Sequence, residues 1–201
     1  MHKLAISVCS FILFTVLYVS FLFAATESDD QKLYLSIDSK YRTKNYEEVL
    51  KQTRTFLQKH PSSHYADQVY LFRALTLIAQ NQFDQAITNL KKALEVTKEG
   101  SFKSMIHYNL AFAYFESKEI TKAESLLESV QPAQLTQENR SKFYILRAKV
   151  RRHNQNWPGA SADIFRAIEN SNNPGNKTLL QPLVSFLEVV LEPIDNLDQL
   201  E

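Results

Sequence analysis

The sequence predicts an all-α protein, an α-α superhelix in which antiparallel helical hairpins stack side by side. Three observations support this fold class. Among 201 residues there are three glycines, where average usage of roughly 7% would give about fourteen. Apolar residues recur at steps of three and four, which is the period of a helix face. A set of these residues also returns every 37 positions, as stacked repeats require.

The composition argues against several functional classes. Lys and Arg number 23 and Asp and Glu number 22, giving a net charge of +1, whereas nucleic-acid-binding domains carry a basic excess. Phosphate loops and nucleophile elbows need glycine at sharp or closely approached backbone positions, and neither motif occurs. His60 and His64 are four residues apart, but Pro61 interrupts the helix that would align them on a metal. We therefore expect no enzyme activity, no cofactor, no metal and no nucleic-acid partner.

The first element is an uncharged apolar stretch over residues 4–25, LAISVCSFILFTVLYVSFLFAA. Lys3 precedes it and acidic residues follow, as in an export signal whose basic end stays in the cytoplasm. Two alternatives remain open. A signal peptide (residues 1–25) would be cleaved after Ala24 or Ala25, and an uncleaved signal anchor would attach the chain to the membrane. In both cases we expect the rest of the chain outside the cytoplasm.

Four repeat units follow over residues 26–177. Their approximate bounds are 30–66, 67–103, 104–140 and 141–177. The bulky residue after the polar turn of each unit is Tyr46, Phe83, Ile120 or Trp157. Three positions later lie Val49, Ala86, Ala123 and Ala160, and nine positions before the bulky residue lie Ile37, Ala74, Ala111 and Ala148. Because small residues let two helix backbones approach closely, each unit is expected to be a helix, a tight turn and a second antiparallel helix. Neighbouring units then share one core.

This pattern resembles the tetratricopeptide repeat (TPR) family. The second unit matches best, through Tyr70, Ala74, Phe83, Ala86, Leu90 and Ala93. The first unit is degenerate, because Ile37, Val49 and Phe56 replace small residues. The linker HPSSHYADQ at 60–68 is similar to connections in bacterial cell-envelope TPR proteins of the outer-membrane assembly lipoprotein and Tol–Pal coordinator type. The resemblance implies a location in the periplasm or cell envelope, with the anchored alternative held in the inner membrane.

In this family the first helices line a concave groove that binds a partner peptide or helix. The resemblance places a groove on residues that share the register of the first helices. These are Tyr34, Tyr41, Leu71, Leu75, Ile78, Tyr108, Phe112, Phe115, Lys149 and Arg152, with Asp38, Met105, Ile145 and His153 beside them. The lysine–asparagine clamp of chaperone-binding members is absent, because Leu75, Phe112 and Lys149 occupy its positions. An alternative is that Phe112 and Phe115 pack against the facing helix instead of lining a groove.

A basic run, RAKVRRHNQ at 147–155, allows two interpretations. Its cations could belong to a solvated helix face, or they could bind an acidic partner, a lipid head group or a glycan. They are Arg147, Lys149, Arg151 and Arg152.

The last element, residues 178–201, is apolar on more than one side over 178–191. It is expected to be a capping helix or the start of a further repeat, since Ile194 continues the 37-residue register. This edge would dock on a partner or a second copy, or the chain would be the N-terminal part of a longer protein. The sequence as a whole predicts an exported scaffold for protein–protein interactions. The alternative is the TPR region of a cell-wall synthase activator or another glycan-related accessory protein.

Overall fold

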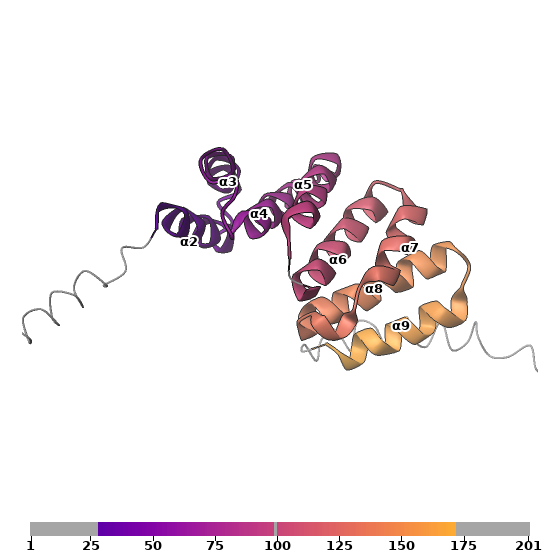
Figure 1. Ribbon diagram of the computed structural model, residues 1–201. Coiled ribbons are helices and arrows are strands. Elements are labelled where there is room, and N and C mark those ends of the chain that lie inside the picture. Colours follow the sequence, from indigo (N-terminus) through magenta and orange to yellow (C-terminus); the bar gives the residue numbers. More distant parts are fainter. Residues whose placement is uncertain (1–27, 99, 172–201) are drawn as a thin grey trace, which may run out of the picture.

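The computed structural model describes residues 28–98 and 100–171 (Figure 1). The two terminal segments singled out above, 1–25 and 178–201, lie outside these residues. Within the described ranges the structure is all-helical, with eight α-helices and one short 3₁₀ helix. The α-helices are α2 (Asp29–Arg42), α3 (Tyr46–Lys59), α4 (Ala66–Ala79), α5 (Phe83–Val96), α6 (Gly100–Glu116), α7 (Ile120–Ser129), α8 (Gln137–His153) and α9 (Trp157–Glu169). The 3₁₀ helix η1 (Pro132–Gln134) joins α7 to α8.

The helices form four successive antiparallel hairpins, α2–α3, α4–α5, α6–α7 and α8–α9. Each second helix also packs against the first helix of the next hairpin, so the hairpins stack from one end of the array to the other (Figure 1). The second helices begin at Tyr46, Phe83, Ile120 and Trp157, the four bulky residues that repeat every 37 positions. This stacked all-α architecture confirms the predicted fold class.

The core follows the repeat columns of the sequence. Four columns fill it: the small or apolar residue of each first helix, and three positions along each second helix. Their members are Ile37, Ala74, Ala111 and Ala148; Val49, Ala86, Ala123 and Ala160; Thr53, Leu90, Leu127 and Ile164; and Phe56, Ala93, Val130 and Ala167. None of these side chains is more than 5% exposed. The alanines let first and second helices approach closely, and the larger side chains fill the space between hairpins.

The turn inside each hairpin has one repeated geometry. Lys44, Asn81, Lys118 and Gln155 have φ values of 57°, 59°, 66° and 59° and are spaced by 37 residues. In the third hairpin the Lys118 N–H donates to the Phe115 carbonyl, and the Glu119 N–H donates to the Tyr114 carbonyl. The other three turns have the same pair of bonds. This is the Schellman arrangement of a helix C-terminus, which usually places glycine at the left-handed position.

The turns therefore explain part of the glycine scarcity. Each is closed by the same two backbone hydrogen bonds, with Lys, Asn or Gln in the left-handed conformation. Two second helices add a side-chain cap: Asn45 accepts from the Glu48 N–H, and Asn156 accepts from the Gly159 N–H. The chain thus reverses direction four times without a glycine in the left-handed position.

Candidate partner-binding groove

The first helices together line a groove of about 420 Å³. All its lining residues come from α2, α4, α6 and α8. They are Tyr41, Leu75, Ile78, Met105, Tyr108, Asn109, Phe112, Asn139, Lys142, Ile145, Leu146 and Lys149. The groove exists because successive first helices lie side by side on one face of the stack, while the second helices form the opposite layer.

The floor of the groove is aliphatic and aromatic. Leu75, Ile78 and Phe112 are half-buried, since one side of each packs against the main core and the other lines the groove. Tyr108 is 9% exposed, and burial, with the nearby Glu138 carboxylate, raises its pKa to about 12. Burial also raises the pKa of Tyr41. Both phenols therefore stay neutral at physiological pH and add hydroxyl groups to the lining of the groove.

The polar part of the groove lies on α6 and α8. The Asn109 amide donates to the Met105 carbonyl at 2.8 Å, which leaves its side-chain oxygen available as an acceptor. Lys142 forms an ion pair with Glu138 one turn earlier on α8. Lys149 is exposed, and within the described part of the chain its ammonium group makes no hydrogen bond or ion pair. The groove therefore combines an apolar floor with one unpaired cation at its rim.

Six of the residues named from the sequence lie together in this groove: Tyr41, Leu75, Ile78, Tyr108, Phe112 and Lys149. Met105 and Ile145 line it as well. Phe112 packs against the core, as its alternative interpretation predicts. It also lines the groove.

Four named residues lie elsewhere. Tyr34 is near the N-terminal end of the array, where its ring stacks on Tyr65 at 4.3 Å and its hydroxyl donates to Gln68. Leu71 is in the core, 5% exposed. Phe115 packs against the core in the last turn of α6, and Arg152 is exposed near the end of α8. None of the four contributes to the lining of the groove.

Sequence reasoning missed four lining residues, Asn109, Asn139, Lys142 and Leu146. The register contains a signal for one of them, since Lys142 lies 37 residues after Met105, which the sequence places beside the groove. Asn109 and Leu146 share a register position too, next to Tyr108 and Ile145. Asn139 had no such signal, because its counterpart in the third repeat is Phe102, which packs against the core.

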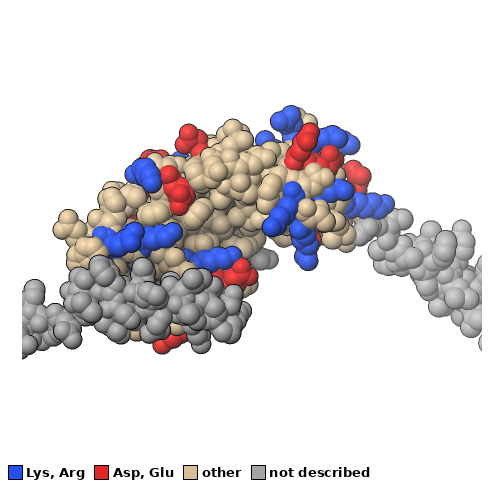
Figure 2. Space-filling model, turned by 180° about the vertical axis from the view of Figure 1, so that it is seen from behind, with Lys and Arg blue, Asp and Glu red and all other residues tan. Residues whose placement is uncertain are grey.

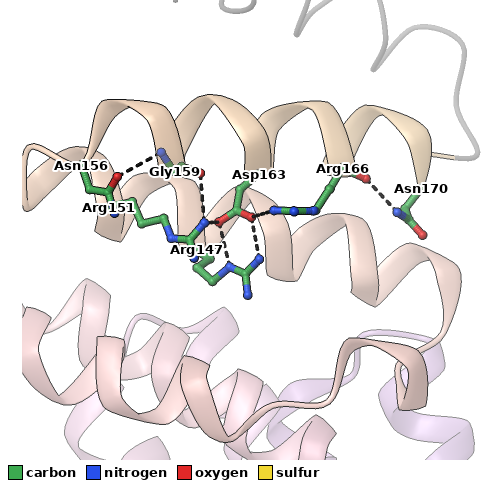
Figure 3. Close-up of polar contacts among 7 residues, drawn as sticks. All are labelled: Arg147, Arg151, Asn156, Gly159, Asp163, Arg166 and Asn170. Atoms are coloured by element: carbon green, nitrogen blue, oxygen red, sulfur yellow. Dashed lines mark hydrogen bonds and ion pairs between the residues drawn. The ribbon is translucent and has the colours of Figure 1, made fainter.

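The basic run at 147–155 has an explanation that neither sequence interpretation contained. Arg147 and Arg151 on α8 converge with Arg166 on the carboxylate of Asp163, which is 0% exposed (Figure 3). Arg147 binds both carboxylate oxygens, at 2.7 and 2.6 Å. Its guanidinium also lies 4.9 Å from the ring centroid of Phe143 and 5.2 Å from that of Tyr144. These arginines join α8 to α9, so only Lys149 and Arg152 of the predicted cluster are exposed without a carboxylate partner in the described part.

Charged side chains of both signs are mixed on the face of the molecule seen in Figure 2. A broad uncharged area lies between the charged groups. Within residues 28–98 and 100–171 there is no group of three His, Cys, Asp or Glu side chains that could hold a metal ion. None of the helices in the same ranges has the length and apolar character needed to cross a membrane. The groove is therefore the feature that we consider as a functional site.

Comparison with known proteins agrees with the geometry. The sequence model of the tetratricopeptide repeat-like domain matches residues 20–142, which is more than half of the chain. Among solved structures, the "MamA RS-1 ArsTM double mutant" is similar with a TM-score of 0.63 at 14% identity, over 87% of this chain and 92% of that chain. MamA 41-end from Desulfovibrio magneticus RS-1 gives a TM-score of 0.63 at 16% identity, over 82% and 86%. No curated protein matches the sequence. At these identities the solved structures show a shared fold, and the domain match identifies the chain as a member of the tetratricopeptide repeat-like family.

Proposed function

We propose that this chain is a non-catalytic scaffold whose groove binds a segment of a partner protein that carries apolar side chains beside a carboxylate. TPR-like domains are in general protein-interaction scaffolds, which supports the general class. The observation that carries the specific proposal is the unpaired Lys149 at the rim of an apolar groove. The resemblance to cell-envelope TPR proteins remains a prediction of the sequence.

The chemistry of the groove defines the ligand. Its volume of about 420 Å³ lies within the range of roughly 300–1,000 Å³ found for ligand sites. A ligand that covers the exposed parts of Leu75, Ile78 and Phe112 gains binding free energy. The gain is about 25 cal/mol for each Å² of apolar surface removed from water. Lys149 attracts an anionic group, and the protonated Tyr108 and Tyr41 add hydroxyl donors without charge. A ligand with aliphatic side chains next to Asp or Glu satisfies all of these groups.

The test is selection of random ten-residue peptides, displayed on phage, against the full chain. We expect the selected peptides to combine aliphatic residues with Asp or Glu. Phe112→Ala should weaken a selected peptide at least tenfold, because an aromatic contact at the centre of a groove contributes more than about 1.4 kcal/mol. Lys149→Glu should weaken it further by replacing attraction with repulsion. Fluorescence anisotropy of the labelled peptide measures both effects.

A matched control is Lys92→Glu on the exposed face of α5, in the opposite helical layer. It introduces the same charge change at a distance from the groove and should leave peptide affinity unchanged. Selected peptides that bind the Phe112→Ala chain as well as the native chain would contradict the proposal. Circular dichroism of each variant checks that the repeat array is intact.

We also propose that residues 4–25 direct the chain out of the cytoplasm. Their uncharged apolar sequence behind Lys3 supports this. Cell fractionation followed by N-terminal sequencing tests it. A cleaved chain would begin at Ala25 or Thr26, and an anchored chain would keep Met1 in the membrane fraction. Leu13→Asp, which interrupts the apolar run, should keep the chain in the cytoplasm, and a native chain found in the cytoplasm would refute export.

A further inference from the structure

One segment of this chain has the chemistry that the groove favours. Residues 192–201 read EPIDNLDQLE and contain three aliphatic residues, each followed directly by an acid. The pairs are Ile194–Asp195, Leu197–Asp198 and Leu200–Glu201. No basic residue occurs in the segment. The preceding stretch, 178–191, differs in having a single acid, Glu188.

The groove is complementary in charge and polarity. Its lining within the described residues holds two lysines, Lys142 and Lys149, and no Asp or Glu. Glu138 neutralises Lys142 in part through their ion pair, while Lys149 has no acidic partner among the described residues. The two lysines lie seven residues apart on α8, so they are separated by about 10 Å along the helix axis. A segment with acids at every third position can place carboxylates near both of them.

The chain leaves the described part at the C-terminal end of α9, close to the first turns of α8. The Ser141 hydroxyl on α8 donates to the Ala167 carbonyl on α9 at 2.8 Å, and the Arg140 guanidinium reaches the Asn170 side chain at 3.4 Å. The C-terminal end of α9 therefore lies next to the first turns of α8, which carry the lining residues Asn139 and Lys142. Even a fully helical stretch of twenty residues, the length of 172–191, would extend about 30 Å. Residues 192–201 can therefore reach the groove of their own chain.

We propose that residues 192–201 bind in the groove of the same chain and compete there with the partner. This inference rests on the groove being the binding site proposed above. Complementary charge and the exit point of α9 favour this segment over an unrelated occupant. A partner must then displace it, so partner affinity is lowered by the fraction of chains whose groove is occupied.

Disulfide cross-linking of the full chain tests the contact. Cys9→Ser removes the natural cysteine, and Met105→Cys in the groove is combined with Leu197→Cys. The control pair places the first cysteine at Lys92 on α5 instead. We expect the groove pair to form an intramolecular disulfide at least ten times faster than the control pair, as judged by non-reducing electrophoresis and mass spectrometry.

Charge exchange makes the test specific. Lys142→Glu with Lys149→Glu should slow the cross-link several-fold, and adding Asp195→Lys with Asp198→Lys should restore it. Equal rates for groove and control pairs would overturn the inference. A disulfide that forms only between chains would identify a second copy as the occupant and would also overturn it.

A binding measurement separates this inference from the function on which it rests. Asp195→Lys with Asp198→Lys should raise the affinity of a phage-selected peptide at least threefold, because the competing segment is released. If that peptide binds the groove of both chains equally well, the inference fails and the groove function stands. If no selected peptide binds the groove of either chain, the proposed function fails, and the cross-linking result then decides the inference by itself.

Discussion

Asp163 is a carboxylate that is fully buried, at 0% exposure, within the α8–α9 hairpin. Burying a carboxylate is costly unless it is paired and hydrogen-bonded. Arg147, Arg151 and Arg166 provide these bonds from two helices, at distances of 2.6 to 3.1 Å. Their own side chains are 23%, 29% and 48% exposed, so each arginine keeps contact with water. The carboxylate is thus the fixed centre that holds α8 against α9.

Asp163→Asn should lower the free energy of unfolding by about 3 kcal/mol, toward the lower end of the range for breaking a buried ion pair. An amide keeps the size of the side chain but cannot accept from three guanidinium groups or offset their mutual repulsion. Urea denaturation followed by circular dichroism measures the change. The control is Glu95→Gln, at an exposed position of α5. It should change the free energy of unfolding by less than about 0.5 kcal/mol. A loss that does not exceed that of the control would contradict this account.

Asp30 gives a prediction for acid pH. Hydrogen bonds from the Ser28 and Ser63 hydroxyls hold its pKa at about 2, below the ordinary value of 3.8. Because the pKa is lowered in the fold, its stabilising contribution is complete above pH 3.8 and is lost as pH falls through 2. Ser63→Ala should move the Asp30 pKa back toward 3.8, as followed by NMR of the side-chain carboxyl. Ser62→Ala, at an exposed neighbour, should leave it in place, and equal titration curves for both variants would rule out the Ser63 bond.

At the scale of single elements, the turn inside each hairpin is the most regular feature. The left-handed residue and its two flanking backbone bonds recur every 37 positions, and the following helix begins two residues later. The segments between hairpins are less regular: the chain passes from Lys59 to Ala66, from Val96 to Gly100 and from Ser129 to Gln137. The turns therefore fix the geometry of each hairpin, and the linkers absorb the differences between repeats.

Lys118→Gly should stabilise the protein by roughly 0.5–1 kcal/mol. An L-residue pays about 1–2 kcal/mol in the left-handed region, and the greater freedom of glycine in the unfolded chain offsets part of this gain. Thermal and urea unfolding measure the effect. The same substitution within α5, Lys92→Gly, should instead destabilise by about 1 kcal/mol. Destabilisation by both substitutions would contradict the role assigned to the turn.

The elements were predictable where one residue type recurs in one column. Alanine at 74, 111 and 148 indicated close helix contacts, and the bulky residues mark the first residue of each second helix. The Asp163 cluster was not predictable in this way. The register equivalents of Asp163 are Leu126, Asn89 and Gln52, so no column predicts a carboxylate there. An exception within one repeat becomes visible only when the side chains from α8 and α9 are placed together.

At the scale of the whole molecule, stability is distributed along a stack. Each hairpin contacts its neighbours, so the free energy of folding is close to a sum over hairpins and their interfaces. The Asp163 cluster lies in the α8–α9 hairpin, whereas Arg73 joins α4 to α3 by donating to the Leu50 carbonyl at 2.9 Å. Damage at one end should therefore spread only weakly to the other.

Hydrogen exchange tests this locality. In the Asp163→Asn chain, amide protection in α8 and α9 should fall at least tenfold, whereas protection in α2 and α3 should change less than twofold. Peptide-level mass spectrometry resolves the two ends. Equal loss of protection in all four hairpins would show that the array unfolds as one cooperative unit.

The groove shows how far register alone determines a site. Tyr34, Leu71, Tyr108 and Ile145 share one register position, but only Tyr108 and Ile145 line the groove. Leu71 is covered by the core, while Tyr34 belongs to the α2–α3 hairpin and packs on Tyr65. The sequence identified the face of the stack that holds the groove. The place of each residue along the array, and what packs over it there, decides which of the equivalent side chains line the groove.

The four left-handed turns are equivalent positions from which distances along the array can be measured. Lys44, Asn81, Lys118 and Gln155 are all exposed and mark the same point of each hairpin. Because backbone bonds hold these turns, a spectroscopic label on any of the four side chains leaves the turn geometry in place. Labels at Lys44 and Gln155 would report the distance across the whole array, and labels at adjacent turns would report a single step. Together they would convert a bend of the array during ligand capture into a set of measured distances.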